Sequence, residues 1–168
     1  MAYDRIQLAT TKSQLPAVVA KTTRRMPELR RTTLPYWRLH YHLVWATNGR
    51  EPLIAATEEQ VIRRSFALTC GDMGLLCHAV GLMPDHAHVA LSVPPRHSIS
   101  EVMKRLKGAS SHAVRATNPG FTWQSEYGAL SFGDQALPKV CAYVLNQREH
   151  HEKGSILARL ERVEPSPG

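Results

Sequence analysis

The stretch from His86 to Val93 alternates between two kinds of side chain, and this pattern limits most strongly what the chain can fold into. His86, His88, Ala90 and Ser92 alternate with Ala87, Val89, Leu91 and Val93. A period of two is typical of a half-buried β-strand. We therefore expect the second set to pack on a core, and the first set to present two imidazoles side by side on the opposite face.

Two imidazoles two residues apart can hold one divalent cation, and a divalent cation assists phosphate chemistry. Histidine pairs at this spacing also arise by chance on protein surfaces, so His86 and His88 alone do not establish a metal site. A second element that supplies a further ligand is needed.

The same division between an apolar and a polar face recurs in an earlier strand, which the sequence predicts from Tyr36 to Ala46. One face of this strand is aromatic and aliphatic, and the other is basic. The apolar face contains Trp37, Leu39, Tyr41, Leu43 and Trp45, and the basic face contains Arg38, His40 and His42.

Further elements follow from caps, turns and periodicity. We expect a helix from Thr57 to about Thr69, strands at 75–82 and 127–132, a helix after Ser98, a long helix from 134–138 to about Lys153, and one short helix near the C-terminus. The order β-α-β-β-α-β-α predicts an α+β, ferredoxin-like (split β-α-β) antiparallel sheet with an added C-terminal helix.

The chain divides by composition into three parts. Residues 1–34 are basic and interrupted by proline, and we expect a flexible arm that contacts phosphates, although a solubilising tail explains them equally well. Residues 35–154 would form one catalytic domain, and residues 155–168 a short tail.

The net charge of +7 favours polyanionic partners, nucleic acid first. Three scattered cysteines without a CxxC pair fit a reducing cytoplasm. No apolar run reaches the roughly 20 residues of a membrane span, and no secretory signal is evident. We therefore expect a cytoplasmic protein without a membrane partner.

The long final helix provides the second half of a possible site. Tyr143 and Gln147 are four residues apart and would share one helical face at the border of the apolar arc. A glutamine oxygen beside two imidazoles gives a ligand set that suits Mg²⁺ or Mn²⁺. A tyrosine near that metal favours covalent phosphoryl transfer by a phenolate. A tyrosine at the edge of a core is the simpler interpretation of Tyr143.

These residues, taken in order, resemble a known family. His86-Ala87-His88 followed by Tyr143-x-x-x-Gln147 is similar to the single-tyrosine HUH transposases, the TnpA enzymes of small insertion sequences and their REP-associated relatives. The resemblance extends from about Tyr36 to His151. It includes Tyr41-His42-Leu43-Val44-Trp45, Lys107-Gly108-x-Ser110-Ser111, Trp123-Gln124-x-Glu126-Tyr127-Gly128 and Asn146-Gln147-x-x-His150-His151.

The resemblance implies roles for individual residues. His86, His88 and Gln147 would bind Mg²⁺ or Mn²⁺, and Tyr143 would be the nucleophile that leaves a 5′-phosphotyrosine and a free 3′ hydroxyl on single-stranded DNA. Rejoining would need no ATP or other nucleotide cofactor. The family works as a homodimer and recognises DNA hairpins near the cleavage site.

Two other functions fit parts of the sequence. A domesticated protein of the same fold would bind structured single-stranded DNA or RNA without cutting it. The DNA-binding candidates in either case are Arg38, His40, His42, Lys104, Arg105 and Lys107. A histidine-nucleophile phosphohydrolase is disfavoured, because Ala90 stands where a third alternating histidine would be expected.

Overall fold

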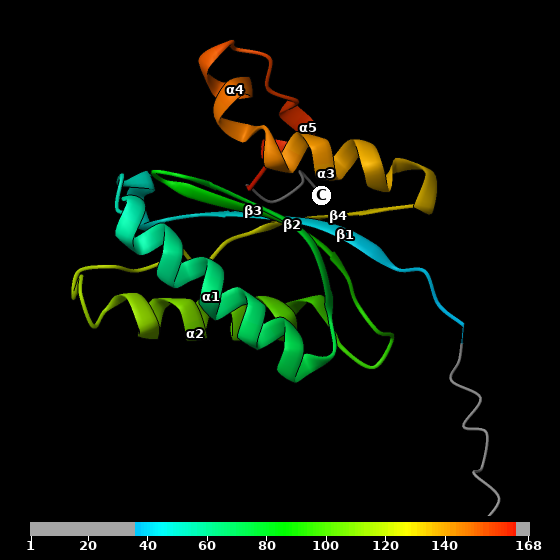
Figure 1. Cartoon of the computed structure of the whole chain (residues 1–168), viewed down its shortest axis with the longest axis horizontal. Helices are drawn as coiled ribbons and strands as arrows, with labels where there is room; N and C mark the ends of the chain where they lie inside the picture. Colours follow the sequence, from blue (N-terminus) through cyan, green and yellow to red (C-terminus); the bar gives the residue numbers. More distant parts are fainter. Residues whose placement is uncertain (1–35, 164–168) are drawn as a thin grey trace, which may run out of the picture. The chain divides into compact units, whose positions relative to one another are not determined.

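We describe residues 36–163 in a computed structural model (Figure 1). The expected basic arm at 1–34 lies outside the described residues. The strands are β1 (His40–Ala46), β2 (Leu76–Met83), β3 (His86–Ser92) and β4 (Gly128–Phe132). The helices are α1 (Ala56–Met73), α2 (Ile99–Val114), α3 (Leu137–Leu145), α4 (Gln147–Glu152) and α5 (Ala158–Glu161), with 3-10 turns η1 (Asn48–Arg50) and η2 (Asp134–Ala136).

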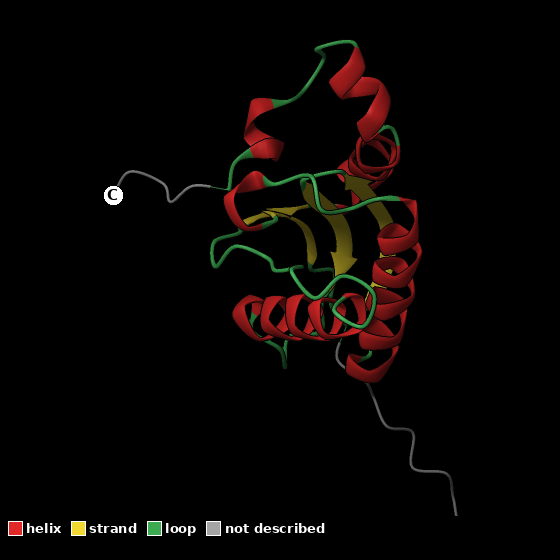
Figure 2. Ribbon diagram, turned by 90° about the vertical axis from the view of Figure 1, so that its left-hand side faces the viewer, coloured by secondary structure: helices red, strands yellow, loops and turns green. Residues whose placement is uncertain are grey.

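The four strands form one antiparallel sheet in the order β2-β3-β1-β4. The helices α1 and α2 cover one face of this sheet, and α3, α4 and α5 lie on the opposite face (Figures 1 and 2). This is the ferredoxin-like arrangement that the element order predicts, with the C-terminal helices added on the face opposite α1 and α2. The prediction of fold class is confirmed.

The larger hydrophobic core lies between the sheet and the α1–α2 layer. Trp45, Phe66, Leu91 and Leu106 are fully buried in it, each from a different element. The core on the other face is much smaller, and its buried members are Ala79, Ala90, Val140 and Val144. The described part of the chain contains no helix that is both long and apolar enough to cross a bilayer.

The first strand begins later than the sequence predicts. It starts at His40 rather than Tyr36, because His40 already pairs with the last residues of β3 and β4, Ser92 and Phe132. Without a partner strand, Tyr36 stays exposed. Alternation alone does not show where the neighbouring strands end.

Helix α1 also differs from the prediction at its two ends. It begins at Ala56 without a side-chain cap, because the Thr57 hydroxyl donates to the Glu58 carboxylate instead of capping the helix. It continues past Thr69 to Met73 and is capped by Gly74, whose φ of 67° is the left-handed conformation that glycine adopts readily. Ser98 caps the following helix, since its hydroxyl accepts from the Glu101 amide.

The long final helix of the prediction is broken at Asn146. The backbone there (φ −99°, ψ 22°) leaves the helical region, so α3 and α4 are separate helices. The expectation that Tyr143 and Gln147 share one face of one helix is therefore wrong. Both side chains nevertheless turn inward and are buried.

A glycine in β2 lets α3 and α4 approach the sheet. A Cβ atom placed on Gly81 would lie 2.2 Å from the Val144 carbonyl oxygen and 3.0 Å from Gln147 Cγ. No side chain fits in that space. The position of Gln147 over the sheet thus depends on Gly81.

We expect Gly81→Ala to lower the free energy of unfolding by about 1–3 kcal/mol, because the helices must shift away from β2. Gly108→Ala is the matched control: its Cβ would meet no atom within 4 Å on helix α2, and alanine there should be neutral or stabilising by up to about 1 kcal/mol. Urea unfolding measures both. Equal effects of the two substitutions would contradict the close packing described here.

Candidate metal and tyrosine site

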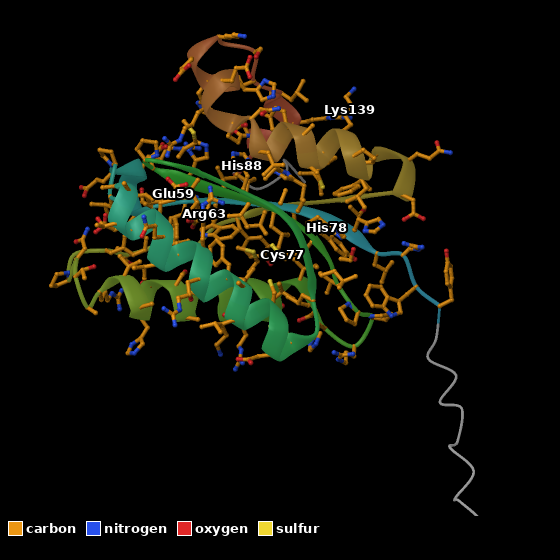
Figure 3. All side chains as sticks on the ribbon, viewed as in Figure 1. Glu59, Arg63, Cys77, His78, His88 and Lys139 are labelled. Atoms are coloured by element: carbon orange, nitrogen blue, oxygen red, sulfur yellow. The ribbon has the colours of Figure 1, made fainter. Side chains whose placement is uncertain are left out.

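His86 and His88 lie on β3, which is an inner strand of the sheet. Their neighbours across the sheet are Ala46 and Val44 on β1, and both histidines are almost fully buried. The two ring centroids are 4.9 Å apart. The alternation of β3 is thus as predicted, but the imidazole face is covered by the C-terminal helices rather than open to solvent (Figure 3).

Each of the two imidazoles is oriented by a hydrogen bond to its Nδ1 atom. His86 Nδ1 lies 2.6 Å from the Asp85 carboxylate, and His88 Nδ1 lies 3.0 Å from His42 Nε2. Both Nε2 atoms are left without a hydrogen-bond partner. A partner on one ring nitrogen fixes the ring so that the other is available as a ligand.

Burial favours the neutral forms of His86 and of His42, the partner of His88. Burial, with the charge of His88 as a smaller cause, lowers the pKa of His86, although Asp85 and Glu161 oppose the shift. The same two causes lower the pKa of His42 to about 3. Neutral imidazole is the metal-binding form of histidine.

A carboxylate from α5 faces the two histidines. Glu161 Oε2 lies 3.2 Å from His88 Nε2 and 3.7 Å from His86 Nε2. One ligand atom from each of His86, His88 and Glu161 lies within 4.8 Å of the others. His151 also approaches, with its Nε2 atom 3.8 Å from the same carboxylate oxygen.

Gln147, the first residue of α4, is buried against the strand next to the histidine pair. Its side chain lies against Gly81, which is paired with His88 across the β2–β3 ladder. Gln147 is 1% exposed, and neither its Oε1 nor its Nε2 atom has a hydrogen-bond partner.

The donor atoms of this cluster fit a metal ion. The described residues contain seven buried side-chain nitrogen or oxygen atoms without a hydrogen-bond partner, and five of them belong to His86, His88, Gln147 and His151. Buried polar atoms without partners are costly, so such a concentration in one place is unusual. A cation bound there would satisfy several of them together.

Tyr143 lies beside the histidine pair of its own chain. Its ring centroid is 6.3 Å from that of His88 and 4.8 Å from that of His150, on which it stacks. The hydroxyl donates a hydrogen bond to Glu161 Oε1 and accepts one from the Leu157 amide at 3.1 Å. Burial and the bond to Glu161 raise the pKa of Tyr143, while Leu157 and Gln147 act in the opposite direction.

The candidate DNA-binding residues fall into two groups. His40 and His42 are buried, and each ring is hydrogen-bonded inside the protein: His40 to Ser92 and Asp134, His42 to His88. Arg38, Lys104 and Arg105 are exposed, while Lys107 is half-buried and donates to the Ser125 carbonyl. The two histidines are therefore not available at the surface, whereas the arginine and lysine side chains are.

Three residues of the cluster are not among the metal or catalytic residues that the sequence predicts. Glu161 lies in the segment expected to be only a tail, His42 was expected to contact DNA, and His151 was noted only within the family resemblance. The one sequence signal that favours the C-terminal segment is the spacing of Leu157, Leu160 and Val163, of which the last two are buried.

Comparison with known proteins gives a consistent result. The family model described as "Transposase IS200 like" matches residues 35–147. The ISDra2 transposase TnpA of Deinococcus radiodurans is 25% identical over 121 residues, which are 67% of this chain and 86% of that protein. The transposase of insertion sequence element IS200 from Salmonella typhimurium is 28% identical over 75 residues, which are 45% of this chain and 49% of that protein.

Solved structures share the fold. A crystal structure of a Deinococcus radiodurans R1 protein with a provisional transposase assignment matches with a TM-score of 0.56 and 27% identity, over 67% of this chain and 93% of that one. A REP-associated tyrosine transposase bound to a REP hairpin matches with the same TM-score and 19% identity, over 75% of this chain and 74% of that one.

We expect Mn²⁺ to stabilise the folded chain, because a ligand that binds only the native state raises its stability, by about 2.7 kcal/mol at 100 times its Kd. His88→Ala should lose this effect. His112→Ala, at an exposed position of α2, should keep it. Thermal unfolding with and without Mn²⁺ measures the shift, and a shift that is unchanged in His88→Ala would place the ion elsewhere.

Proposed function

Because the chain belongs to the IS200-like transposase family, we propose that it cuts and rejoins single-stranded DNA through a covalent 5′-phosphotyrosine on Tyr143, assisted by a divalent metal ion. Family membership makes it a transposase that acts in DNA transposition. The chemistry of the individual step is the proposal.

The observation that supports the proposal most strongly is the short distance between the rings of Tyr143 and His88 within one chain. The two rings come from different layers, α3 and β3, and lie nearly perpendicular at 6.3 Å. The simpler interpretation, a tyrosine at the edge of a core, does not explain a hydroxyl that is bonded to a carboxylate whose other oxygen faces the two histidine Nε2 atoms.

In the proposed step the Tyr143 oxygen attacks phosphorus, and the bond from phosphorus to the 3′ oxygen breaks. The phenol proton leaves, and the 3′ oxygen gains a proton to become a free hydroxyl. Because one phosphate ester replaces another, a later attack by a 3′ hydroxyl on the phosphotyrosine rejoins the strands without ATP. The phenol must lose its proton against the effect of burial, which raises its pKa.

His86, His88 and Gln147 would hold the metal. Two nitrogen ligands and one oxygen ligand suit Mg²⁺ or Mn²⁺ and leave coordination positions open. When bound, the ion supplies Lewis-acid stabilisation of the non-bridging phosphate oxygens. Asp85 and His42 hold the two imidazoles in the orientation that such a site needs.

The proposed substrate is single-stranded DNA with a hairpin. One similar structure is that of a REP-associated tyrosine transposase bound to a REP hairpin. The net charge of +7 suits a polyanion, and Arg38, Lys104 and Arg105 are exposed cations that can contact phosphates. We keep the homodimer as part of the proposal, although Tyr143 and the histidine pair already meet within one chain.

We expect the protein to form an SDS-stable covalent adduct with 3′-labelled hairpin DNA in the presence of Mn²⁺, whereas a 5′ label should leave on the fragment with the free 3′ hydroxyl. Tyr143→Phe should abolish the adduct completely, because no other oxygen nucleophile replaces the phenol. Tyr41→Phe, a half-buried tyrosine that packs on the larger core, is the matched control and should leave the adduct unchanged.

His88→Ala should lose adduct formation and keep much of the DNA affinity, because the phosphate contacts of lysine and arginine are separate from the metal. Cleavage that persists in Tyr143→Phe would remove the nucleophile assignment. Tight hairpin binding by the wild-type protein with no adduct under any metal condition would favour the non-cutting binder.

A further inference from the structure

Glu161 lies beyond the part of the chain that the family model matches, yet it is at the centre of the site. The match ends at residue 147, and Glu161 is the last residue of α5. Its side chain is 17% exposed. Glu161 therefore adds a carboxylate to the site, and this carboxylate lies outside the segment that the family model matches.

The two oxygen atoms of Glu161 have different neighbours. Oε1 accepts the hydrogen bond of the Tyr143 hydroxyl. Oε2 faces the unpartnered Nε2 atoms of His88, at 3.2 Å, and His86, at 3.7 Å, without forming an aligned hydrogen bond to either. Oε1 thus orients the Tyr143 hydroxyl, and Oε2 can coordinate the same cation as the two imidazole Nε2 atoms.

The backbone around Glu161 is held in place by packing. Leu160 and Val163, on either side of it, are 5% and 7% exposed. A Cβ atom on Gly128 would lie 2.0 Å from the Arg162 carbonyl oxygen, so β4 is shaped to accept this segment. The Leu157 amide also donates to the Tyr143 hydroxyl. The position of the carboxylate follows from these contacts and not from a chance surface approach.

We propose that Glu161 is a fourth ligand of the metal ion, binding through Oε2 while Oε1 positions the Tyr143 hydroxyl. This inference rests on the metal site of the proposed function. Two neutral imidazoles and an amide carry no charge, and a carboxylate gives the ligand set the negative charge and hard oxygen that Mg²⁺ and Mn²⁺ prefer.

The test measures Mn²⁺ binding to the full chain by calorimetry and by the relaxation of water protons around bound Mn²⁺. Glu161→Gln keeps the shape of the side chain and an acceptor for Tyr143, but removes the charge. We expect the Mn²⁺ affinity to fall at least about tenfold, with an additional water molecule on the ion. Glu152→Gln, at an exposed position of α4, is the control and should bind Mn²⁺ like the wild type.

Glu161→Asp separates ligation from a structural role. It keeps the charge on a shorter side chain and should retain more Mn²⁺ affinity than Glu161→Gln. Equal losses in both variants, or unchanged or tighter binding in Glu161→Gln, would overturn the ligand assignment. If Glu161→Gln does not fold, the wild-type water count decides: four protein ligands leave about two of roughly six positions for water, and three ligands leave about three.

The two proposals fail in different ways. A wild-type protein that binds no Mn²⁺ would overturn both the metal assistance and the role of Glu161. A wild-type protein that binds Mn²⁺ and forms the DNA adduct, with Glu161→Gln binding equally well, would remove only the fourth ligand.

Discussion

Two imidazole rings with unsatisfied nitrogen atoms lie inside this protein, and the arrangement of its C-terminal third is best understood from them. His86 and His88 are on an inner strand with both faces covered, so water does not reach their Nε2 atoms. An unsatisfied polar atom in the interior costs on the order of 1–3 kcal/mol. The elements that approach these atoms all bring polar groups: Gln147, His151 and Glu161.

The two faces of the sheet differ in how much hydrophobic core they carry. The face toward α1 and α2 carries most of the hydrophobic core, with large side chains such as Trp45 and Phe66. The buried apolar cluster between the sheet and α3 contains only Ala79 and Ala90 from the sheet and Val140 and Val144 from α3. The α1–α2 layer therefore contributes most of the stability, whereas the opposite layer is occupied largely by the polar groups of the site.

The sequence predicts the half of the site that depends on local pattern. Alternation places His86 and His88 on one face of a strand. The predicted shared helical face of Tyr143 and Gln147 is broken at Asn146, although both side chains are buried. The approach of Glu161 is not predictable in this way, because it depends on how the chain turns back after Gly154 and on the burial of Leu160 against the rest of the protein. Such long-range packing leaves little local signal.

Local pattern also misled at specific places. His40 and His42 alternate with apolar residues as a solvent-exposed basic face would, but their strand is covered on both sides, and the rings make internal hydrogen bonds. The break at Asn146 is invisible in the apolar periodicity of the final helix. It is nonetheless what allows Gln147 to lie over Gly81 beside His88.

The site is divided between two layers that are held together by few apolar contacts. The sheet provides the nitrogen ligands, and the C-terminal helices provide the phenol, the amide and the carboxylate. The exposed ion pair between Arg148 and Glu59 joins α4 to α1 but adds little stability at the surface. Separation of the helices from the sheet would remove Tyr143, Gln147 and Glu161 from the histidines in one movement. A cation bound between the layers would therefore stabilise their docking, so that metal binding and the placement of the nucleophile are coupled.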